Sequence, residues 1–465
     1  MNFAKSVEFK QGMNPNQEFL LPKKSSDFLP EGHLARAVYE IVGLLDLENI
    51  RNKYSQRGQH AYDPRTMVRL LFYGYCTGVR SSRKISQGCE ERFDFVYLTD
   101  NLKPSHDRVS DFRKDNLQEL KDIFRDIVLI GANLGLVKLG NIRVSIDGSK
   151  VKANASPKLT KNERGLEKLM VKIESEISQI FEEAKRVDEE EHQKYGNARG
   201  DELPEKLRER KSRLNAIREA HELLKRQKEE AAKNVREEKQ REPTQKEMKK
   251  IEAMKINVTD TDAKFMKERN GVIRPNYNVQ LSVDEEEQFI LANNVTDECN
   301  DHHQLAPMLR QAEQNIGERP KQAKADSGYL AQLEEAARMF PETEFLIDDK
   351  NRRKNPDMEK IKKTYSVVRL ENLERLMTNE GEDKYKKRMH TVEPVIGNIK
   401  SNLGYRNFLL RGLSKARGEF NLMCIAHNLK KIVNFIKKSG LSLAEAIENF
   451  AMKRANETFA PRIPG

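Results

Sequence analysis

The chain has 465 residues, no tryptophan, 34% charged residues and a net charge of +11 from 84 Lys and Arg against 73 Asp and Glu. This length is too great for one compact core and predicts two or three domains, and the high charged fraction predicts a soluble protein. The basic excess is modest, so it is compatible with a polyanionic partner without requiring one.

The cysteines and the apolar segments limit the compartment. Cys76, Cys89, Cys299 and Cys424 form no C-x-x-C pair, which argues against a structural zinc site and against a disulfide scaffold. The first ten residues contain no apolar run after their charges, and no segment approaches 18 consecutive apolar residues. We therefore expect neither secretion nor a membrane span, and we expect a cytoplasmic protein in a reducing compartment.

Residues 1–30 are polar and irregular, and we interpret them as an arm. Residues 31–138 have a helical pattern, because apolar side chains recur at spacings of three and four. Pro64 precedes the second of these runs and marks a helix start. The periodic positions are Leu34, Val38, Ile41, Val42 and Leu45, followed by Met67, Leu70, Leu71 and Tyr75.

A further helix is predicted to open at Ser81, where Arg80, Arg83 and Lys84 gather at one junction. Short helices joined by turns can present such a helix to a DNA groove. An all-α packing domain with a solvated basic rim explains the same spacing. Both interpretations stay open at this level.

The first strand is predicted over residues 141–147. Ile142, Val144 and Ile146 alternate with polar residues, which is the period of a strand, and Gly148 follows Asp147 as a turn signal. We expect Asp147 to end this strand. A carboxylate there would lie at the rim of a sheet, where α/β proteins usually place their chemistry.

Residues 159–255 differ abruptly in composition and are rich in Glu, Lys, Arg and Gln. Apolar residues in the first half alternate steps of four and three, which is the spacing of a coiled-coil seam. The pattern breaks at residues 195–200 and resumes after Pro204, which predicts an inserted antiparallel helical hairpin. His221 lies in the return seam, where we expect a structural polar position rather than a metal ligand. The seam positions are Leu166, Met170, Ile173, Ile177, Ile180, Ala184 and Val187, then Leu207, Leu214, Ile217 and Leu224.

Strands return in residues 256–420. Residues 277–283 and 289–295 predict a hairpin around the acidic turn 284–287, and a helix is expected over residues 303–315. A short strand ends in Asp326, and another covers residues 344–348. Arg352 and Arg353 belong to a basic loop over residues 349–355. Residues 421–465 are expected to form a polar-faced helical tail.

The stretch Thr391–Lys400 combines a carboxylate and a lysine on a short apolar segment. Proline is tolerated in the first turn of a helix, so Pro394 predicts that a helix begins here with Glu393 near its N-terminus. Lys400 follows two helical turns later and shares a face with Glu393. An ordinary amphipathic helix fits this segment equally well when it is taken alone.

Asp147, Asp326 and Glu393 form a candidate metal site. Two Mg²⁺ ions need bridging and flanking oxygen ligands, and such a site activates an attacking oxygen and stabilises the leaving oxygen of a phosphoryl transfer without a histidine base. The other nearby acids, Asp262, Asp284, Asp301 and Asp348, are interpreted as strand-edge or loop residues and not as ligands.

At these residues the chain resembles the bacterial insertion-sequence transposases of the DDE type. Residues 62–75, 81–85 and 104–113 resemble an InsH-like N-terminal domain, and residues 145–155, 324–329 and 391–400 are similar to the three acidic motifs of the family. The resemblance covers nearly the whole chain. It implies a ribonuclease H-like core with a mixed α/β sheet, an all-α N-terminal domain over 31–138, a catalytic domain over 139–158 and 256–420, and the inserted hairpin over 159–255.

The resemblance also implies roles for individual residues. Asp147, Asp326 and Glu393 are expected to be the catalytic and metal-binding triad. The family has a Tyr, Arg, Glu and Lys signature with two, three and six intervening residues, and Tyr385, Arg388, Glu393 and Lys400 give two, four and six. Lys400 is expected to contact DNA near the cleaved phosphate. The further residues expected to bind DNA are Tyr385, Arg388, Lys150, Lys152, Arg83, Lys84, Arg352 and Arg353.

The expected function is therefore a DNA transposase that uses two Mg²⁺ ions, with Mn²⁺ able to substitute, to hydrolyse phosphodiester bonds at element ends and join the 3′-hydroxyl to target DNA. Such enzymes act as homodimers on DNA, and the hairpin can pair protomers, clamp DNA or pack within one chain. The alternatives are a nuclease of the same fold without strand transfer and an inactive transposase-derived DNA-binding protein.

Overall fold

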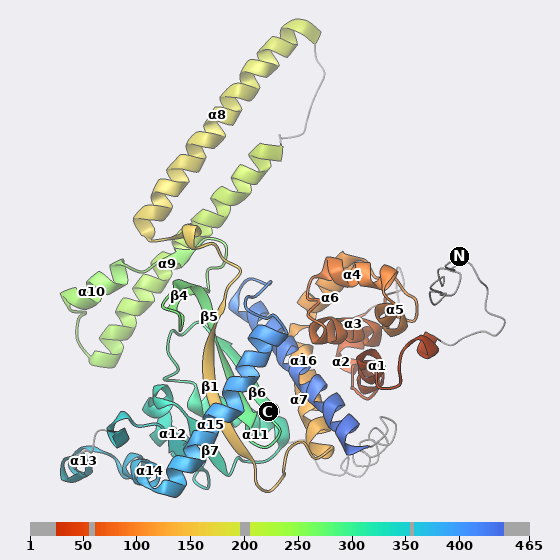
Figure 1. Cartoon of the computed structure of the whole chain (residues 1–465). Helices are drawn as coiled ribbons and strands as arrows, with labels where there is room; N and C mark the ends of the chain where they lie inside the picture. The colour runs from red at the N-terminus through yellow and green to blue at the C-terminus, as the bar shows by residue number, and fades with distance from the viewer. Residues whose placement is uncertain (1–24, 55–60, 196–204, 354–357, 441–465) are drawn as a thin grey trace, which may run out of the picture.

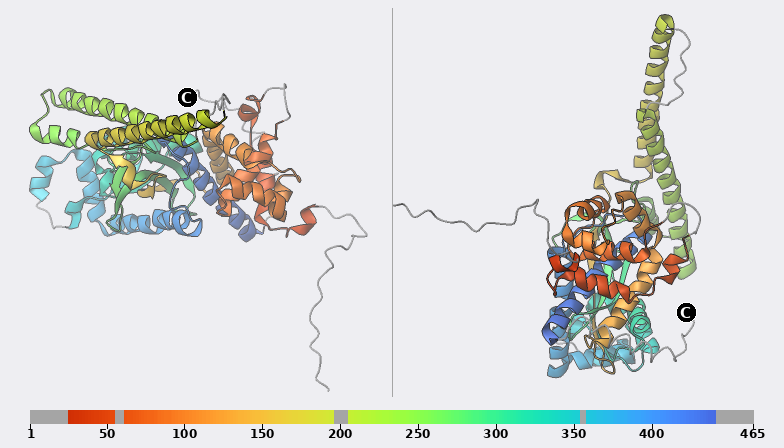
Figure 2. Two further views of the ribbon diagram at one scale, coloured as in Figure 1. Left: turned by 90° about the horizontal axis from the view of Figure 1, so that it is seen from above. Right: turned by 90° about the vertical axis from the view of Figure 1, so that its right-hand side faces the viewer.

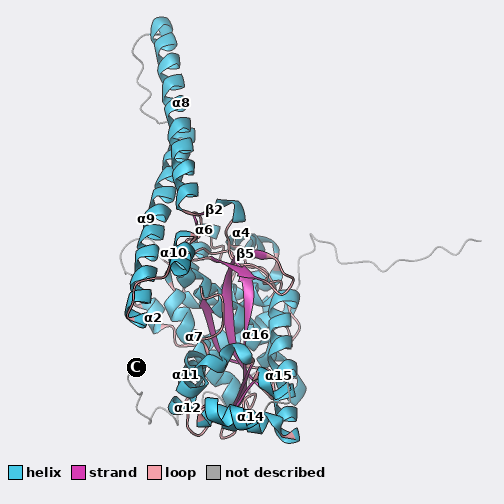
Figure 3. Ribbon diagram, turned by 90° about the vertical axis from the view of Figure 1, so that its left-hand side faces the viewer, coloured by secondary structure: helices cyan, strands magenta, loops and turns pink. Residues whose placement is uncertain are grey.

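The computed structural model describes residues 25–54, 61–195, 205–353 and 358–440, which form a body with one large sheet and a helical hairpin that projects from it (Figures 1 and 3). The fold is mixed α/β, as the sequence predicts. Most of the predicted arm and the residues after 440 lie outside the described residues. None of the described helices is long and apolar enough to cross a membrane.

Seven helices form the N-terminal part of the described chain. The start predicted at Pro64 is confirmed, because Pro64 is the first residue of α3 and the Asp63 side chain accepts a hydrogen bond from the Arg65 N–H at 2.7 Å. The apolar positions predicted from their spacing are buried, except for Leu34, which is partly buried against the same core. The helices are α1 (Leu34–Gly43), α2 (Glu48–Arg51), α3 (Pro64–Cys76), α4 (Ser82–Glu91), α5 (Phe93–Leu98), α6 (His106–Asp115) and α7 (Leu117–Asn133).

Six strands form the large sheet. β5 pairs antiparallel with β1 on one side and with β4 and β6 on the other, while β1, β7 and β8 run parallel to one another. This mixed order is consistent with the expected ribonuclease H-like core. The strands are β1 (Arg143–Lys152), β4 (Lys264–Lys267), β5 (Ile273–Asp284), β6 (Ile290–Thr296), β7 (Gln322–Ala325) and β8 (Glu344–Ile347).

The prediction that Asp147 ends the first strand is wrong. β1 continues to Lys152, and Asp147 pairs with Leu281 in the middle of the β1–β5 ladder. The turn signal at Gly148 is overridden because β5 has 12 residues and offers hydrogen-bond partners along the whole extension. Asp147 therefore lies on the sheet and not at its rim.

The helix that carries Glu393 also differs from the prediction. α15 runs from Asn379 to Gly397, so it begins 15 residues before Pro394, and Glu393 lies near its C-terminal end. An interior proline leaves the carbonyl four residues earlier without its helical donor. The His390 carbonyl is that group, and it accepts a hydrogen bond from Gln288 Nε2 at 2.9 Å. The side chain from the β5–β6 turn thus compensates for the proline.

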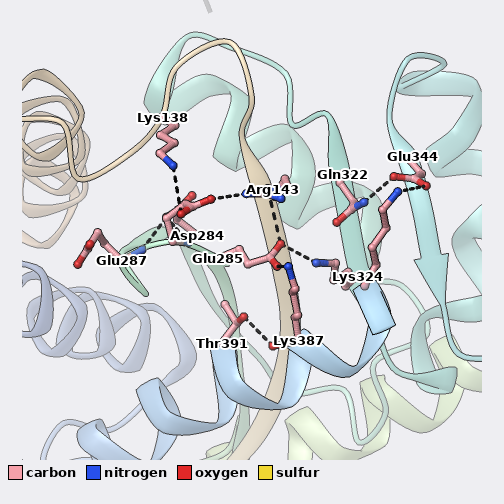
Figure 4. A network of polar contacts seen from close by, with 12 residues as sticks. Lys138, Arg143, Asp284, Glu285, Glu287, Gln322, Lys324, Glu344, Lys387 and Thr391 are labelled. Atoms are coloured by element: carbon pink, nitrogen blue, oxygen red, sulfur yellow. Dashed lines mark hydrogen bonds and ion pairs between the residues drawn. The ribbon is translucent and has the colours of Figure 1, made fainter. Parts of the chain in front are cut away.

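A buried ion-pair cluster fixes α15 to the sheet (Figure 4). Glu285, which follows β5, contacts Lys324 Nζ of β7 at 2.6 Å, Lys387 Nζ of α15 at 3.7 Å and Arg143 Nε of β1 at 3.8 Å. The Lys324 side chain is 1% exposed, so its charge needs a partner. The cluster joins the three elements on which Asp147, Asp326 and Glu393 lie.

The helix predicted as a separate tail from residue 421 is part of the core. α16 (Leu413–Ser439) lies between the N-terminal helices and the sheet and contacts α3, α7 and β6 (Figure 1). Its residues 418–429 are buried on all sides, so the polar face that we predicted is absent over this stretch and is present only towards the end of α16, at Asn434, Lys437 and Lys438. Asn428 uses both ends of its amide to bond the backbone of Ile290 in β6.

The predicted hairpin is present as α8 (Glu163–Tyr195) and α9 (Glu205–Lys239), which project from the body in Figures 1 and 2. Five of the predicted seam positions are buried within this one chain, and Met170, Ile177 and Ile180 are partly buried. The buried positions are Leu166, Ile173, Leu214, Ile217 and Leu224. The two-stranded sheet of β2 (Thr160–Lys161) and β3 (Ile256–Asn257) closes its base. The predicted break covers residues 195–200; Tyr195 is the last residue of α8, and residues 196–200 lie outside the described residues. The side chains of Ala184, Val187 and Leu207 also lie outside them.

Candidate active site

The candidate site lies along an open edge of β1. β7 pairs with β1 only over residues 143–145, and the next backbone contact on this edge is the bridge between Lys152 and Asn407. Asp147 lies in the interval between them, and Asp326 directly follows the last residue of β7. The structure thus brings these two acids together where β1 pairs with β5 on one side but has no strand partner on its β7 side, so other groups can approach from that side.

Asp147 is buried, and its position is set by two hydrogen bonds. Oδ1 accepts from the Gly148 N–H at 2.8 Å, and Oδ2 accepts from Arg388 Nη1 at 3.2 Å. Burial raises the pKa of Asp147 to about 6, the Arg388 guanidinium opposes this shift, and the like charge of Asp326 adds to it. The effect of Asp326 on the pKa of Asp147 is consistent with two neighbouring carboxyl groups.

Asp326 is half-buried at the start of the short helical turn η3 (Ser327–Gln332). Its Oδ1 accepts from the Gly328 N–H at 2.8 Å, which fixes the carboxylate relative to the strand end. The strand predicted to end in this aspartate is confirmed.

Glu393 is half-exposed on α15, which contacts β1, β5 and β7. Its Oε1 lies 3.7 Å from Arg269 Nη2 in the turn between β4 and β5. The same arginine lowers the pKa of Asp147, so its guanidinium is a common neighbour of the first and third acids. Sequence reasoning missed Arg269, because nothing local indicates that this turn reaches α15.

Lys400 lies in a π-helical turn, η5 (Asn398–Asn402), which directly follows α15. Such turns are often found at functional sites. Its Nζ donates to Ser149 Oγ at 2.6 Å and to the Lys150 carbonyl at 2.7 Å, so it contacts the open stretch of β1. Burial lowers its pKa to about 8. Lys400 is thus brought to the strand of Asp147, although 250 positions separate it from Lys150.

The other signature residues are buried. Tyr385 packs with Leu346 and Leu376, and the Arg388 guanidinium lies 5.8 Å from the centre of its ring. Arg388 is directed at Asp147 and not at the surface. Although the spacing before Glu393 differs by one residue from the family signature, Arg388 still lies in the site. The Tyr385 ring packs against the Arg388 guanidinium.

The remaining predicted DNA contacts lie in different surroundings. Lys150 is half-buried beside the acids, and Lys152 is exposed. Arg83 and Lys84 are exposed on α4, in the N-terminal helices. Arg80, which the sequence grouped with them, instead donates to the Asn407 carbonyl at 2.6 Å and is largely buried.

The predicted basic loop is only partly available. The Arg352 side chain is 10% exposed, pairs with Asp348 at 2.6 Å and covers the Tyr385 ring. It thus contributes to packing, in contrast to the exposed DNA contact that we predicted. Arg353 ends η4 (Lys350–Arg353), and its side chain lies outside the described residues.

The donor chemistry of the site fits divalent cations, since Asp147, Asp326 and Glu393 offer only carboxylate oxygens on three adjoining elements. Their oxygens do not all come within 4.8 Å of one another; among the described residues, only Glu163, Glu167 and His221 meet that limit. A site for two ions about 3.5–4 Å apart has ligands spread more widely than one for a single ion. The carboxylate set is therefore compatible with two ions.

His221 itself lies at the base of the hairpin seam. Its Nε2 is 3.7 Å from Glu167 and 3.9 Å from Glu163, and Glu163 also contacts Lys228 at 2.7 Å. Because a lysine already pairs with one of the two acids, this group of charges is consistent with the structural role predicted for His221.

Comparison with known families identifies two parts of the chain. A transposase DDE domain matches residues 349–433, which contain Arg388, Glu393 and Lys400, and a transposase domain (DUF772) matches residues 23–115. Comparisons with curated proteins and with solved structures gave no match. The DDE match includes α15, which carries the third acid, and the other match covers α1 to α6. These two matches support an insertion-sequence DDE transposase.

Proposed function

We propose that this transposase cuts DNA at the ends of its element and joins the freed 3′-hydroxyl to target DNA. The observation that supports this most directly is that Asp147 and Asp326 lie beside one open stretch of β1, to which Arg388 and Lys400 also bond. Glu393 lies on α15, which packs against β1. Phosphoryl transfer needs carboxylates for cations and positive groups for phosphate, and this edge provides both.

The three carboxylates would hold two divalent ions, Mg²⁺ or Mn²⁺, which supply activation of the attacking oxygen and stabilisation of the leaving oxygen when bound. Arg388 keeps Asp147 in place and compensates its buried charge. Lys400 contributes a positive charge beside β1, where a phosphate group of the DNA can bind.

The DNA path follows from the charged groups at the surface. Lys150 and Lys152 continue from Lys400 along β1, and Arg83 and Lys84 offer a second contact on the N-terminal helices. We propose that two protomers act together on two element ends in the cytoplasm. The projecting hairpin is placed to pair protomers or to clamp DNA, although its described seam is already filled within one chain.

The test compares the wild type with Asp326→Asn in the presence of Mg²⁺ and a duplex that carries an element end. Cleavage and joined product should both fall more than about 100-fold in the variant, because a metal ligand is lost. Asp383→Asn is the matched control, since Asp383 is exposed on α15.

The possible outcomes distinguish a transposase from a misplaced metal site, a nuclease and an inactive DNA-binding protein. Equal cleavage by wild type and Asp326→Asn would show that the metal site is misplaced. Cleavage without joined product would identify a nuclease, and no cleavage by the wild type on any end duplex would favour an inactive DNA-binding protein.

A further inference from the structure

A row of buried polar side chains on β5 is unusual for the centre of a sheet. Asn276, Asn278, Gln280 and Ser282 are each 0% exposed, on a strand that pairs with neighbours on both sides. Buried polar groups need partners, since an unmet amide costs free energy. Two members of the row use their amides on a single carboxylate, Asp301.

Asp301 is held firmly by these amides. Its Oδ1 accepts from Asn278 Nδ2 at 2.7 Å and from Gln280 Nε2 at 2.6 Å. The buried Tyr329 hydroxyl donates to Gln280 Oε1, which fixes the orientation of that amide. Hydrogen bonds to an ionised group are the stronger kind, so this network orients the carboxylate and leaves Oδ2 outside it.

Asp301 also lies close to the proposed catalytic acids. A Cβ atom added at Gly148 would lie 2.6 Å from Asp301 Oδ1, so the residue after Asp147 has no room for a side chain there. A Cβ atom added at Gly328 would lie 3.7 Å from Asp301 Oδ2 and 2.9 Å from Asp326 Oδ1. The Cβ atom of Asp301 lies at the same distance of 3.7 Å, so the Asp301 side chain, including Oδ2, lies beside the turn that follows Asp326.

The lysine beside these acids supports the same placement. Lys150 Nζ lies 3.9 Å from Asp301 Oδ1. Lys150 follows Asp147 by three residues on β1, so this ion pair connects Asp301 to the strand that carries Asp147.

Asp301 differs in this respect from the other three acids that the sequence grouped with it. Asp262 accepts from the Leu413 N–H at the start of α16, Asp284 accepts from two N–H groups in the β5–β6 turn, and Asp348 pairs with Arg352. These contacts give the three acids local structural roles. The contacts of Asp301 instead connect it to the open edge of β1.

We infer that Asp301 is a fourth carboxylate of the metal centre and contributes Oδ2 to the cation held beside Asp326, an inference that rests on the proposed function. The amides of Asn278 and Gln280 would fix its direction before the ion binds. This assignment replaces the sequence-based interpretation of Asp301 as a loop acid.

The experiment measures Mn²⁺ binding to the full chain without DNA, by the loss of the free-ion electron paramagnetic resonance signal. Asp301→Asn should weaken Mn²⁺ binding about 10–100-fold, as expected for a group that holds or orients a metal. Asp326→Asn should also weaken it, and Asp383→Asn should leave it unchanged. Thermal unfolding without metal checks that each variant is folded.

The outcomes distinguish the two proposals. If Asp326→Asn weakens Mn²⁺ binding and Asp301→Asn does not, the role of Asp301 is refuted while the proposed function stands. If neither the wild type nor any variant binds Mn²⁺, the proposed function fails as well. If Asp301→Asn does not fold, Asp301→Ala replaces it, because water can then bond the two freed amides; unchanged Mn²⁺ affinity in that variant likewise refutes the inference.

Discussion

Lys400 has a half-buried ammonium group that is held by Ser149 Oγ and the Lys150 carbonyl. Burial lowers its pKa to about 8, because transfer out of water disfavours the charged form. Its charge is therefore mostly present at pH 7 and mostly lost at pH 9. A phosphate group bound beside it would favour the charged form, so DNA binding and protonation of Lys400 should be linked.

We predict that wild-type affinity for end DNA falls between pH 7 and pH 9, and that Lys400→Arg removes this fall because guanidinium stays protonated. Lys400→Met should lower the slope of log K against log salt by about 0.9, the value for one lost phosphate contact. Fluorescence anisotropy at several salt concentrations measures both effects. Lys321→Met is the control, since Lys321 is exposed before the other end of β7. An unchanged salt slope in Lys400→Met would exclude the contact.

At the scale of elements, a group of hydrogen bonds centred on His427 of α16, which we call the hub, holds the end of α15. The buried His427 donates from Nε2 to the Gln288 carbonyl at 3.0 Å, and its Nδ1 accepts from Asn398 Nδ2 in η5 at 2.9 Å. Gln288 in turn bonds the His390 carbonyl, which Pro394 leaves without a helical donor. Glu393 lies between these two attachments, so the hub fixes its position along α15.

The hub makes stability depend on pH. Burial lowers the pKa of His427 from 6.5 to about 4, so the unfolded chain binds a proton at a higher pH than the folded chain does. The stability that the neutral, buried imidazole contributes is complete above about pH 6.5 and falls by roughly 3 kcal/mol as the pH falls to 4.

Urea unfolding at pH 7.5 and pH 5 measures the pH dependence. His427→Gln should be less stable at pH 7.5 and should lose less stability on acidification than the wild type. His303→Gln changes an exposed histidine and should retain the wild-type dependence. If His427→Gln has the wild-type dependence, other groups are responsible for it.

At the scale of the whole molecule, a buried charge joins the N-terminal helices to the part of the molecule that contains the large sheet. Glu419 on α16 is 0% exposed, accepts from the Leu409 and Leu410 N–H groups at 2.9 Å each, and pairs with Arg80 at 3.4 Å. The Tyr405 hydroxyl also donates to the Tyr75 carbonyl across the same contact. The two parts of the molecule are therefore connected by polar contacts as well as by the core.

We expect Glu419→Ala to lower the free energy of unfolding by about 3–5 kcal/mol, because it leaves Arg80 and two N–H groups buried without their acceptor. Arg83→Ala, on the exposed face of α4, should change it by less than about 0.5 kcal/mol. Urea unfolding followed by circular dichroism measures both variants. A loss below about 1 kcal/mol for Glu419→Ala would mean that water replaces the carboxylate.

Local patterns in the sequence determined much of the fold. Three- and four-residue spacing predicted the N-terminal helices, alternation predicted the β5–β6 hairpin, and heptad spacing predicted the hairpin of α8 and α9, because each period states which face of an element is buried. The three acidic motifs, taken in order and by their resemblance to the family, predicted the candidate triad, and the transposase DDE domain match includes α15, which carries Glu393.

Only the tertiary structure decided how these elements serve the site. Asp147 lies within a strand because β5 extends past it, and Pro394 lies inside a helix because Gln288 supplies a donor from 102 positions away. Arg80 is largely buried and pairs with Glu419, and Asp301 is held near the proposed acids by hydrogen bonds from the amides of Asn278 and Gln280 on β5. A local period describes one element, whereas each of these outcomes depends on a partner that is distant in the chain.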